Sequence, residues 1–226
     1  MEKITIANVV DFKNKSAASQ ITLINKLNRP KNPDEKSEGG HYWISALSAI
    51  KSALKLDNHQ PIADKIGMLE DILETEQKHI NKVRWQRNID MLHRFEEYDF
   101  SRLQPRTSFR ILKGLDERVP LIIQGLPIKV TPDVIFAFEE NGIKKIGSAM
   151  FVGKLKEYRL DDLAMFNDAL YRFLKKNKGQ EFEVCQECCF VIDIFSLNVV
   201  SFSQIADGSL STYLDDTLEQ ISRLTG

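Results

Sequence analysis

Asp133 is the acidic residue of this sequence whose position most favours chemistry. It follows Thr131 and Pro132 and directly precedes the apolar run VIFAF. Burying an unpaired carboxylate costs several kcal/mol. We therefore expect Asp133 to lie at a solvated edge, to be paired, or to bind a cation. The alternative is a structural role, in which Asp133 closes a turn after Pro132.

The stretch around Asp133 predicts a β-meander. Tight turns are indicated at Gln124-Gly125 and Asn141-Gly142, because Gly and Asn tolerate the positive φ that two-residue hairpins require. The runs beside these turns are apolar and contain β-branched residues, so we expect one continuous antiparallel meander with Asp133 on its second strand. The expected strands cover residues 119–124, 127–138 and 143–152.

Apolar periodicity after the meander predicts a helix and a further strand. Leu163, Phe166 and Leu170 fall on one stripe of the segment 160–176, and lysines follow in its last turn. The apolar run at 188–202 predicts a strand that joins the same sheet. The last twelve residues predict a closing helix.

Before the meander the sequence is predominantly helical. A short run over 16–28 has helical spacing, and longer helical stretches begin at His41 and Pro61. The middle of the stretch from Pro61 to Phe100 is polar, so we expect two helices or a bent one. Its second half carries four basic residues, which indicate a solvated face or, alternatively, a phosphate-contacting face. These residues are Lys78, Lys82, Arg84 and Arg87.

Residues 29–40 are polar and contain Pro and Gly, which predicts a linker or loop. The expected organisation is therefore an N-terminal segment with a polar linker over residues 1–40. A single domain then covers residues 41–226, in which a helical region precedes the meander.

The composition is that of an ordinary globular protein. Apolar residues make up 42%, and 31 Lys and Arg balance 32 Asp and Glu, for a net charge of −1. This balance gives no whole-molecule signal for nucleic acid or membrane, although a local basic face remains compatible with it. No run approaches the ~18 apolar residues of a membrane span, and the N-terminus lacks a signal-peptide core. We expect a cytoplasmic protein with no membrane partner.

From about residue 75 to residue 202, the order of expected elements resembles the PD-(D/E)XK nuclease-like fold. The resemblance implies an α/β (α+β) protein whose mixed sheet is flanked by helices, here with an N-terminal helical extension. Thr131-Pro132-Asp133 stands where this family has its Pro-Asp. The resemblance therefore implies that Asp133 would ligate Mg²⁺ next to the scissile phosphodiester.

The second part of the family motif is degenerate here. The family carries a further acid on the third strand and a lysine two residues later, whereas this sequence has Ser148 and Met150 at that spacing. Serine binds Mg²⁺ poorly and methionine carries no charge. Lys154 is a candidate substitute for the lysine, but it lies ~13 Å further along an extended strand. Glu70, Glu74 and Glu96 are candidate replacements for the acid.

Two further patterns bear on the resemblance. Asn167-x-x-x-Tyr171 is similar to the Gln-x-x-x-Tyr pair of RecB-like members, where i and i+4 share one helix face. Some RecB-like nucleases hold an iron–sulfur cluster with four cysteines, but this chain has only Cys185, Cys188 and Cys189. We expect reduced core thiols and no iron–sulfur cluster.

The sequence thus predicts a nucleic-acid-associated protein of PD-(D/E)XK nuclease-like fold, either a divergent or an inactive Mg²⁺-dependent phosphodiesterase. If it is active, the resemblance implies a Mg²⁺-dependent nuclease. The alternative is a non-catalytic module that keeps the fold, has lost the site and binds a protein partner through the 41–100 helices. The candidate catalytic residues are Asp133, Ser148, Met150, Lys154, Asn167 and Tyr171, with Asp133 as the metal ligand.

Overall fold

The structure, a computed structural model, describes residues 4–29, 43–112, 120–154 and 157–225. The chain divides into two compact units: Asn32–Arg106, and a second unit that combines Met1–Lys31 with Thr107–Gly226. Most of the predicted linker, residues 30–40, lies outside the described residues. In class the protein is α+β, with helices and two mixed sheets.

The unit Asn32–Arg106 is helical. Its helices are α3 (Ile44–Leu56), α4 (Gln60–Thr75) and α5 (His79–His93), followed by a 3₁₀ turn at Phe100–Leu103. They contact one another pairwise. Each helix buries one stripe, as where Ile62, Ile66 and Leu69 of α4 lie at helical spacing.

Of the two alternatives predicted for residues 61–100, two helices or one bent helix, the structure has two helices. Glu76 directly follows the last residue of α4. Its carboxylate accepts hydrogen bonds from the N–H groups of Gln77 and Lys78, both at 2.9 Å, and from Asn81 Nδ2 at 2.8 Å. This contact satisfies donors at the start of α5, where the macrodipole also favours a negative charge.

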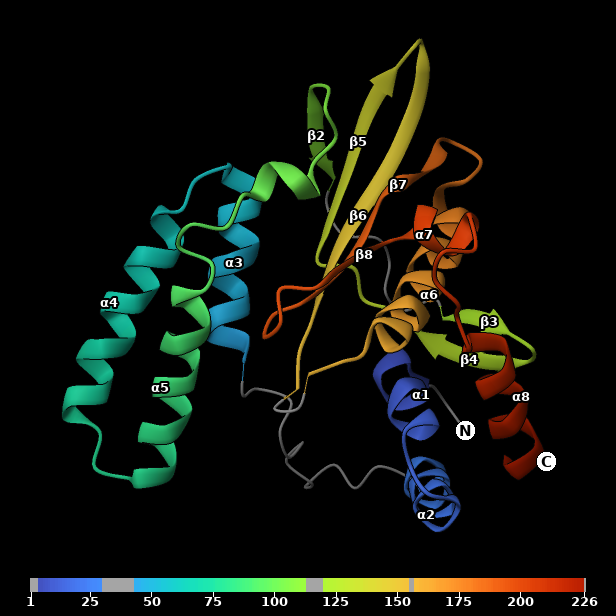
Figure 1. Cartoon of the computed structure of the whole chain (residues 1–226), viewed down its shortest axis with the longest axis horizontal. Helices are drawn as coiled ribbons and strands as arrows, with labels where there is room; N and C mark the ends of the chain where they lie inside the picture. Colours follow the sequence, from blue (N-terminus) through green and yellow to red (C-terminus); the bar gives the residue numbers. More distant parts are fainter. Residues whose placement is uncertain (1–3, 30–42, 113–119, 155–156, 226) are drawn as a thin grey trace. The chain divides into compact units, whose positions relative to one another are not determined.

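The other unit is built on a five-stranded sheet in the order β2-β5-β6-β7-β8. These strands are β2 (Phe109–Leu112), β5 (Val134–Glu140), β6 (Ile143–Val152), β7 (Glu183–Asp193) and β8 (Val199–Ser201). All neighbours are antiparallel except β6 and β7, which are parallel. The helix α6 (Leu160–Lys178) makes the crossover between those two strands and packs on the sheet (Figure 1).

A smaller sheet of three strands, in the order β1-β4-β3, completes this unit. Its strands are β1 (Ile4–Thr5), β3 (Leu121–Ile123) and β4 (Leu126–Lys129), and the helices nearby are α1 (Ile6–Lys13), α2 (Ala17–Asn28), α7 (Phe202–Ala206) and α8 (Leu214–Thr225). Apolar side chains from α1, the small sheet, α6 and α8 share one core cluster. The predicted helices at 160–176 and at the end of the chain are confirmed.

The prediction of one continuous meander is wrong. Both turns form as expected, with positive φ at Gln124-Gly125 and at Asn141-Gly142. However, the first hairpin, β3–β4, belongs to the small sheet, because β4 pairs in parallel with β1 from the N-terminus. The second hairpin, β5–β6, belongs to the large sheet, where β2 supplies the third antiparallel strand. The predicted strand at 188–202 is two strands, β7 and β8, which pair as a hairpin.

Among the helices of the described residues, none has the length and apolar content required to cross a membrane.

Candidate functional site

Asp133 lies at a bend just before β5 rather than on the strand itself. Its N–H donates to the carbonyl of Ala149 at 3.1 Å, and its Oδ2 accepts the N–H of Phe151 at 2.7 Å. Both partners are on β6, so Asp133 extends the pairing of the β5–β6 hairpin by one main-chain bond and one side-chain bond. The half-buried carboxylate therefore has a clear structural use.

Ser148 and Met150, which occupy the positions expected for the acid and the lysine, are both buried on β6. Ser148 Oγ donates to the carbonyl of Val134 at 2.9 Å. Met150 belongs to the apolar core cluster shared with α6. Neither side chain presents an anionic oxygen, so these residues together with Asp133 do not supply the ligand set that Mg²⁺ prefers. Within the described ranges, no group of three or more His, Cys, Asp or Glu side chains is placed to hold a metal ion.

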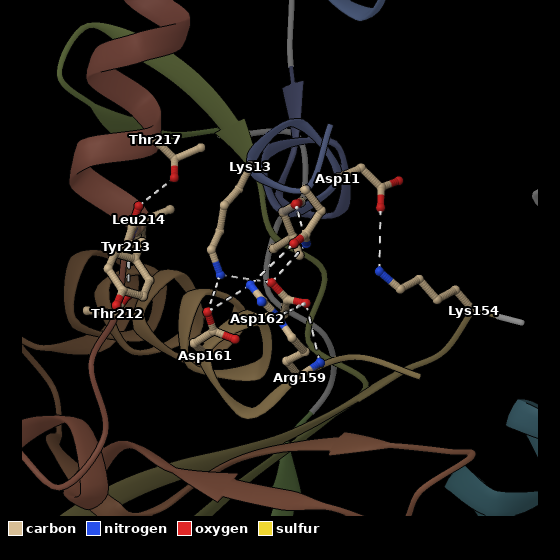
Figure 2. Close-up of polar contacts among 12 residues, drawn as sticks. Asp11, Lys13, Lys154, Arg159, Asp161, Asp162, Thr212, Tyr213, Leu214 and Thr217 are labelled. Carbon is tan, nitrogen blue, oxygen red and sulfur yellow. Dashed lines mark hydrogen bonds and ion pairs between the residues drawn. The ribbon is translucent and has the colours of Figure 1, made fainter. Parts of the chain in front are cut away.

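Lys154 lies beyond the end of β6 and turns toward other partners. Its Nζ is 3.9 Å from Asp11 Oδ1 of α1 and lies 4.0 Å from the centroid of the Tyr158 ring. Figure 2 shows the Lys154 side chain extended toward Asp11. The structure thus brings Lys154, the candidate substitute for the missing lysine, to Asp11 of α1.

Asn167 and Tyr171 lie one turn apart on α6 but make separate contacts. Asn167 is fully buried, and its Nδ2 donates to the carbonyls of Cys189 on β7, at 3.0 Å, and of Val200 on β8, at 2.6 Å. Its Oδ1 has no hydrogen-bond partner among the described residues. Tyr171 stacks on Phe202, with ring centroids 3.7 Å apart. The two residues therefore do not converge on a shared site.

Sequence reasoning missed a cluster of charged side chains that joins α1 to the start of α6, here called the α1–α6 polar cluster and shown in Figure 2. Its members are Lys13, Asn14, Arg159, Asp161 and Asp162. Lys13 Nζ is 2.5 Å from Asp161 Oδ2 and 3.0 Å from Asp162 Oδ1, which also accepts Asn14 Nδ2 at 2.9 Å. The signal in the sequence was the Asp-Asp pair at the start of a helix.

Electrostatics within this cluster favour the charged form of Asp162. Burial alone raises the pKa of its carboxyl group, but hydrogen bonds from Asn14 and Lys13 and the charge of Lys13 outweigh burial and hold the pKa below its usual value. Since each charge has a direct partner, the cluster serves to fix α1 on α6 and offers no open reactive group.

A second group of residues capable of chemistry lies where β7 departs from regular pairing with β6. Ile146 pairs with Val184, and the next pair is Ser148 with Cys189. Four residues of β7, from Cys185 to Cys188, therefore face the single residue Gly147. We call this segment the CxxC bulge. Bulges often re-aim side chains beside functional sites.

Within the CxxC bulge, the thiols of Cys185 and Cys188 affect each other's ionisation. The pKa of Cys185 falls to about 7, because the Cys188 thiol donates a hydrogen bond to its sulfur, and the N–H groups of Cys188 and Glu187 and the Lys145 ammonium add to this effect against burial. The same contact raises the pKa of Cys188, and burial raises that of Cys189. All three cysteines are free, and Cys185 alone among them is partly exposed.

No protein-family model, curated protein or solved structure matches the chain. Its function must therefore be argued from its own residues.

Proposed function

We propose that this protein associates with nucleic acid through a PD-(D/E)XK nuclease-like core and binds without cutting. The arrangement of the large sheet supports the first part of the proposal. Three antiparallel strands, β2, β5 and β6, are followed by the crossover helix α6 and by β7 parallel to β6. Asp133 lies next to the second of these strands, although it directly precedes Val134 and is not part of the strand that the resemblance implies for the first acid.

The observation that carries the proposal is the use of the three motif positions in packing. Asp133 accepts the N–H of Phe151, Ser148 donates to a strand carbonyl, and Met150 fills the core. Removing one electrostatic contributor from an active site can cost about 10²–10³ in rate. With both the second acid and the lysine replaced, we expect no robust phosphodiester hydrolysis.

Support for nucleic acid comes from the charge of one helix. The segment His79–His93 of α5 carries Lys82, Arg84 and Arg87 against a single acid, Asp90, and Lys78 precedes it. Lys78, Lys82 and Arg87 are exposed. Since the whole chain has a net charge of −1, this local excess is the feature suited to contact phosphates.

The second candidate, a protein-interaction module, is favoured by apolar exposure on the same unit. Large apolar side chains of α3, α4 and α5 lie open to solvent, and Ile80 is 76% exposed and Leu56 66% exposed. A contiguous patch of exposed apolar side chains is a feature of protein–protein interaction sites.

The test of binding uses the whole chain with fluorescently labelled single-stranded DNA, double-stranded DNA and RNA. We expect fluorescence anisotropy to show binding that weakens with salt. The double variant Lys78→Gln/Lys82→Gln removes two charges and should reduce the slope of log K against log[salt] by about 1.4–1.8. The matched control, Lys55→Gln/Lys175→Gln, removes two exposed lysines elsewhere and should leave the slope unchanged.

Absence of binding to all three nucleic acids at low salt would refute the proposal and favour the protein-interaction module. A slope unaffected by the α5 substitutions would refute the role of α5. The same preparations are incubated with Mg²⁺ or Mn²⁺ beside Asp133→Ala. We expect no robust cleavage, and strong cleavage that disappears in Asp133→Ala would show that other residues have taken over the missing roles.

A further inference from the structure

The CxxC bulge has the geometry of a reactive dithiol rather than of three passive core thiols. A regular strand would point residues 185 and 188 to opposite faces, since their separation is odd. Here three extra residues of β7 interrupt this alternation, and Cys185 and Cys188 are the two ends of the four-residue segment that Gly147 alone opposes. The hydrogen bond from the Cys188 thiol that lowers the pKa of Cys185 agrees with this placement. The geometry is thus produced by a register shift in parallel pairing, where bulges are rare.

Gly147 makes the bulge sterically feasible. A Cβ at this position would lie 2.5 Å from the carbonyl oxygen of Cys188 and 2.7 Å from its Cβ. Real Cβ contacts of this length essentially never occur, so a side chain at residue 147 would displace Cys188. The absence of a side chain at Gly147 therefore allows the backbone of Cys188 to lie close to β6.

We propose that Cys185 and Cys188 form a dithiol site that reacts with low-molecular-weight disulfides and closes to an intrachain disulfide. Cys185 is the attacking residue because it is the partly exposed member, and Cys188 is the resolving residue because it is buried. This activity is independent of nucleic-acid binding.

The reaction has two exchange steps. The Cys185 thiolate attacks one sulfur of a disulfide RSSR, forms a mixed disulfide with R and releases RS⁻. Cys188 then loses its proton to solvent or to the released thiolate and attacks Cys185 Sγ, which expels the second RS⁻. The protein dithiol loses two electrons and RSSR gains them. The pKa of Cys185 near 7 suits the first step at neutral pH, because attack requires the thiolate and slows when the pKa is far from ambient pH.

The charges around Cys185 come from three strands. Lys145 of β6 stabilises the thiolate, but its Nζ also lies 2.7 Å from Glu140 Oε2 of β5 and 3.6 Å from Glu183 Oε1 of β7. Glu187, within the bulge, disfavours ionisation of Cys188. Lys145 is therefore a positioning residue that acts through its charge, while the Cys188 thiol and the N–H groups of Cys188 and Glu187 also favour the charged form of Cys185.

The test exposes the folded chain to oxidised glutathione at neutral pH and then alkylates the remaining thiols. Intact mass should show the loss of two thiols and no retained glutathionyl group. Digestion after glutamate separates Cys185 from Cys188 at Glu187, so an intrachain disulfide would join the two fragments. Cys189, which is fully buried, should remain reduced in the folded chain. Retention of all three thiols, when the urea-unfolded chain does react, would overturn the proposal.

Variants separate the roles of the residues. Cys188→Ala should accumulate a mixed disulfide with one glutathionyl group, whereas Cys189→Ala should close the disulfide as the parent does. Alkylation of Cys185 by iodoacetamide should follow a midpoint near pH 7 in the parent. This midpoint should rise in Lys145→Gln and stay in place in Lys144→Gln, which alters the exposed neighbour on the same strand. Equal midpoints in the two lysine variants would refute the role of Lys145.

Discussion

Gly147→Ala tests the steric basis of the CxxC bulge most directly. The new Cβ would lie 2.4 Å from Phe136 Cε2, 2.5 Å from the Cys188 carbonyl oxygen and 2.7 Å from Cys188 Cβ. Phe136 is itself buried, and the Cys188 atoms belong to the backbone or adjoin it, so no flexible side chain can relieve the contacts. Overpacking of this kind costs about 1–3 kcal/mol. For a chain of this length that corresponds to a fall in Tm of about 2–12 °C.

The matched control is Gly67→Ala in α4, which makes the same chemical change where no atom lies within 4 Å of the added Cβ. Because alanine is the better helix former, this variant should gain about 0.5–1 kcal/mol. Urea unfolding followed by far-UV circular dichroism measures both variants. Trp43 and Trp85 are both in the helical unit, so tryptophan fluorescence follows the unfolding of that unit alone. A Gly147→Ala protein as stable as the parent would contradict the close approach of β6 and the bulge.

Two other substitutions test contacts made by α6. Asp162→Asn should destabilise the protein by about 1.5–3 kcal/mol at pH 7, because it removes the buried one of the two carboxylates that pair with Lys13 and leaves Asp161 in place. Since the folded pKa of Asp162 is lowered, its stabilisation is present above the unfolded value of about 3.9 and is lost as pH falls through the folded pKa, so the difference in urea unfolding should shrink in acid. If the loss of unfolding free energy did not depend on pH, or equalled the loss in the exposed variant Asp216→Asn, the stabilising role of Asp162 would be contradicted. Asn167→Ala should lower the free energy of unfolding by about 1–3 kcal/mol, because two strand carbonyls lose their hydrogen bonds to its amide. The loss should exceed that in Asn177→Ala, whose amide donates to a carbonyl of its own helix. Equal losses would argue against the bridging role of Asn167.

Local signals in the sequence predicted local structure well. The Asn141-Gly142 and Gln124-Gly125 turns form because these residues adopt the positive φ that the hairpins need. The stripe of Leu163, Phe166 and Leu170 is likewise buried in α6, although burial there extends to every residue from Asp162 to Leu170. In both cases the decisive interactions lie within a few residues of one another.

Long-range pairing accounts for the errors in the fold. Strand β4 leaves the expected meander because Ile4 and Thr5 pair with its residues Ile128 and Lys129. Pro132, which lacks an N–H, lies in the segment that separates β4 from β5. Apolar periodicity carries no information about such a partner, since it specifies which face of a strand is buried and not which strand lies beside it.

Prediction of the candidate site was also limited by the lack of information about long-range pairing. The sequence marked Cys185, Cys188 and Cys189 as a group, but the consequence of their spacing depends on the register of β7 against β6. Regular pairing would have separated the two thiols of the CxxC bulge. Similarly, Lys154 and Asp133 share the same region of the sequence, yet Lys154 is drawn to Asp11, which lies far away in the sequence and could not be chosen from spacing.

The α1–α6 polar cluster can form only after a long part of the chain has been synthesised. Lys13 and Asp161 are 148 positions apart, and the helical unit is synthesised as one uninterrupted segment between them. A ribosome that adds about 5–20 residues per second makes Lys13 wait on the order of 7–30 s for its partner. During that interval Val9, Val10 and Phe12, all buried in the folded protein, lack the α6 surface that later covers them. An apolar segment synthesised well before α6 is therefore shielded late, and it is a segment that a nascent-chain chaperone would encounter.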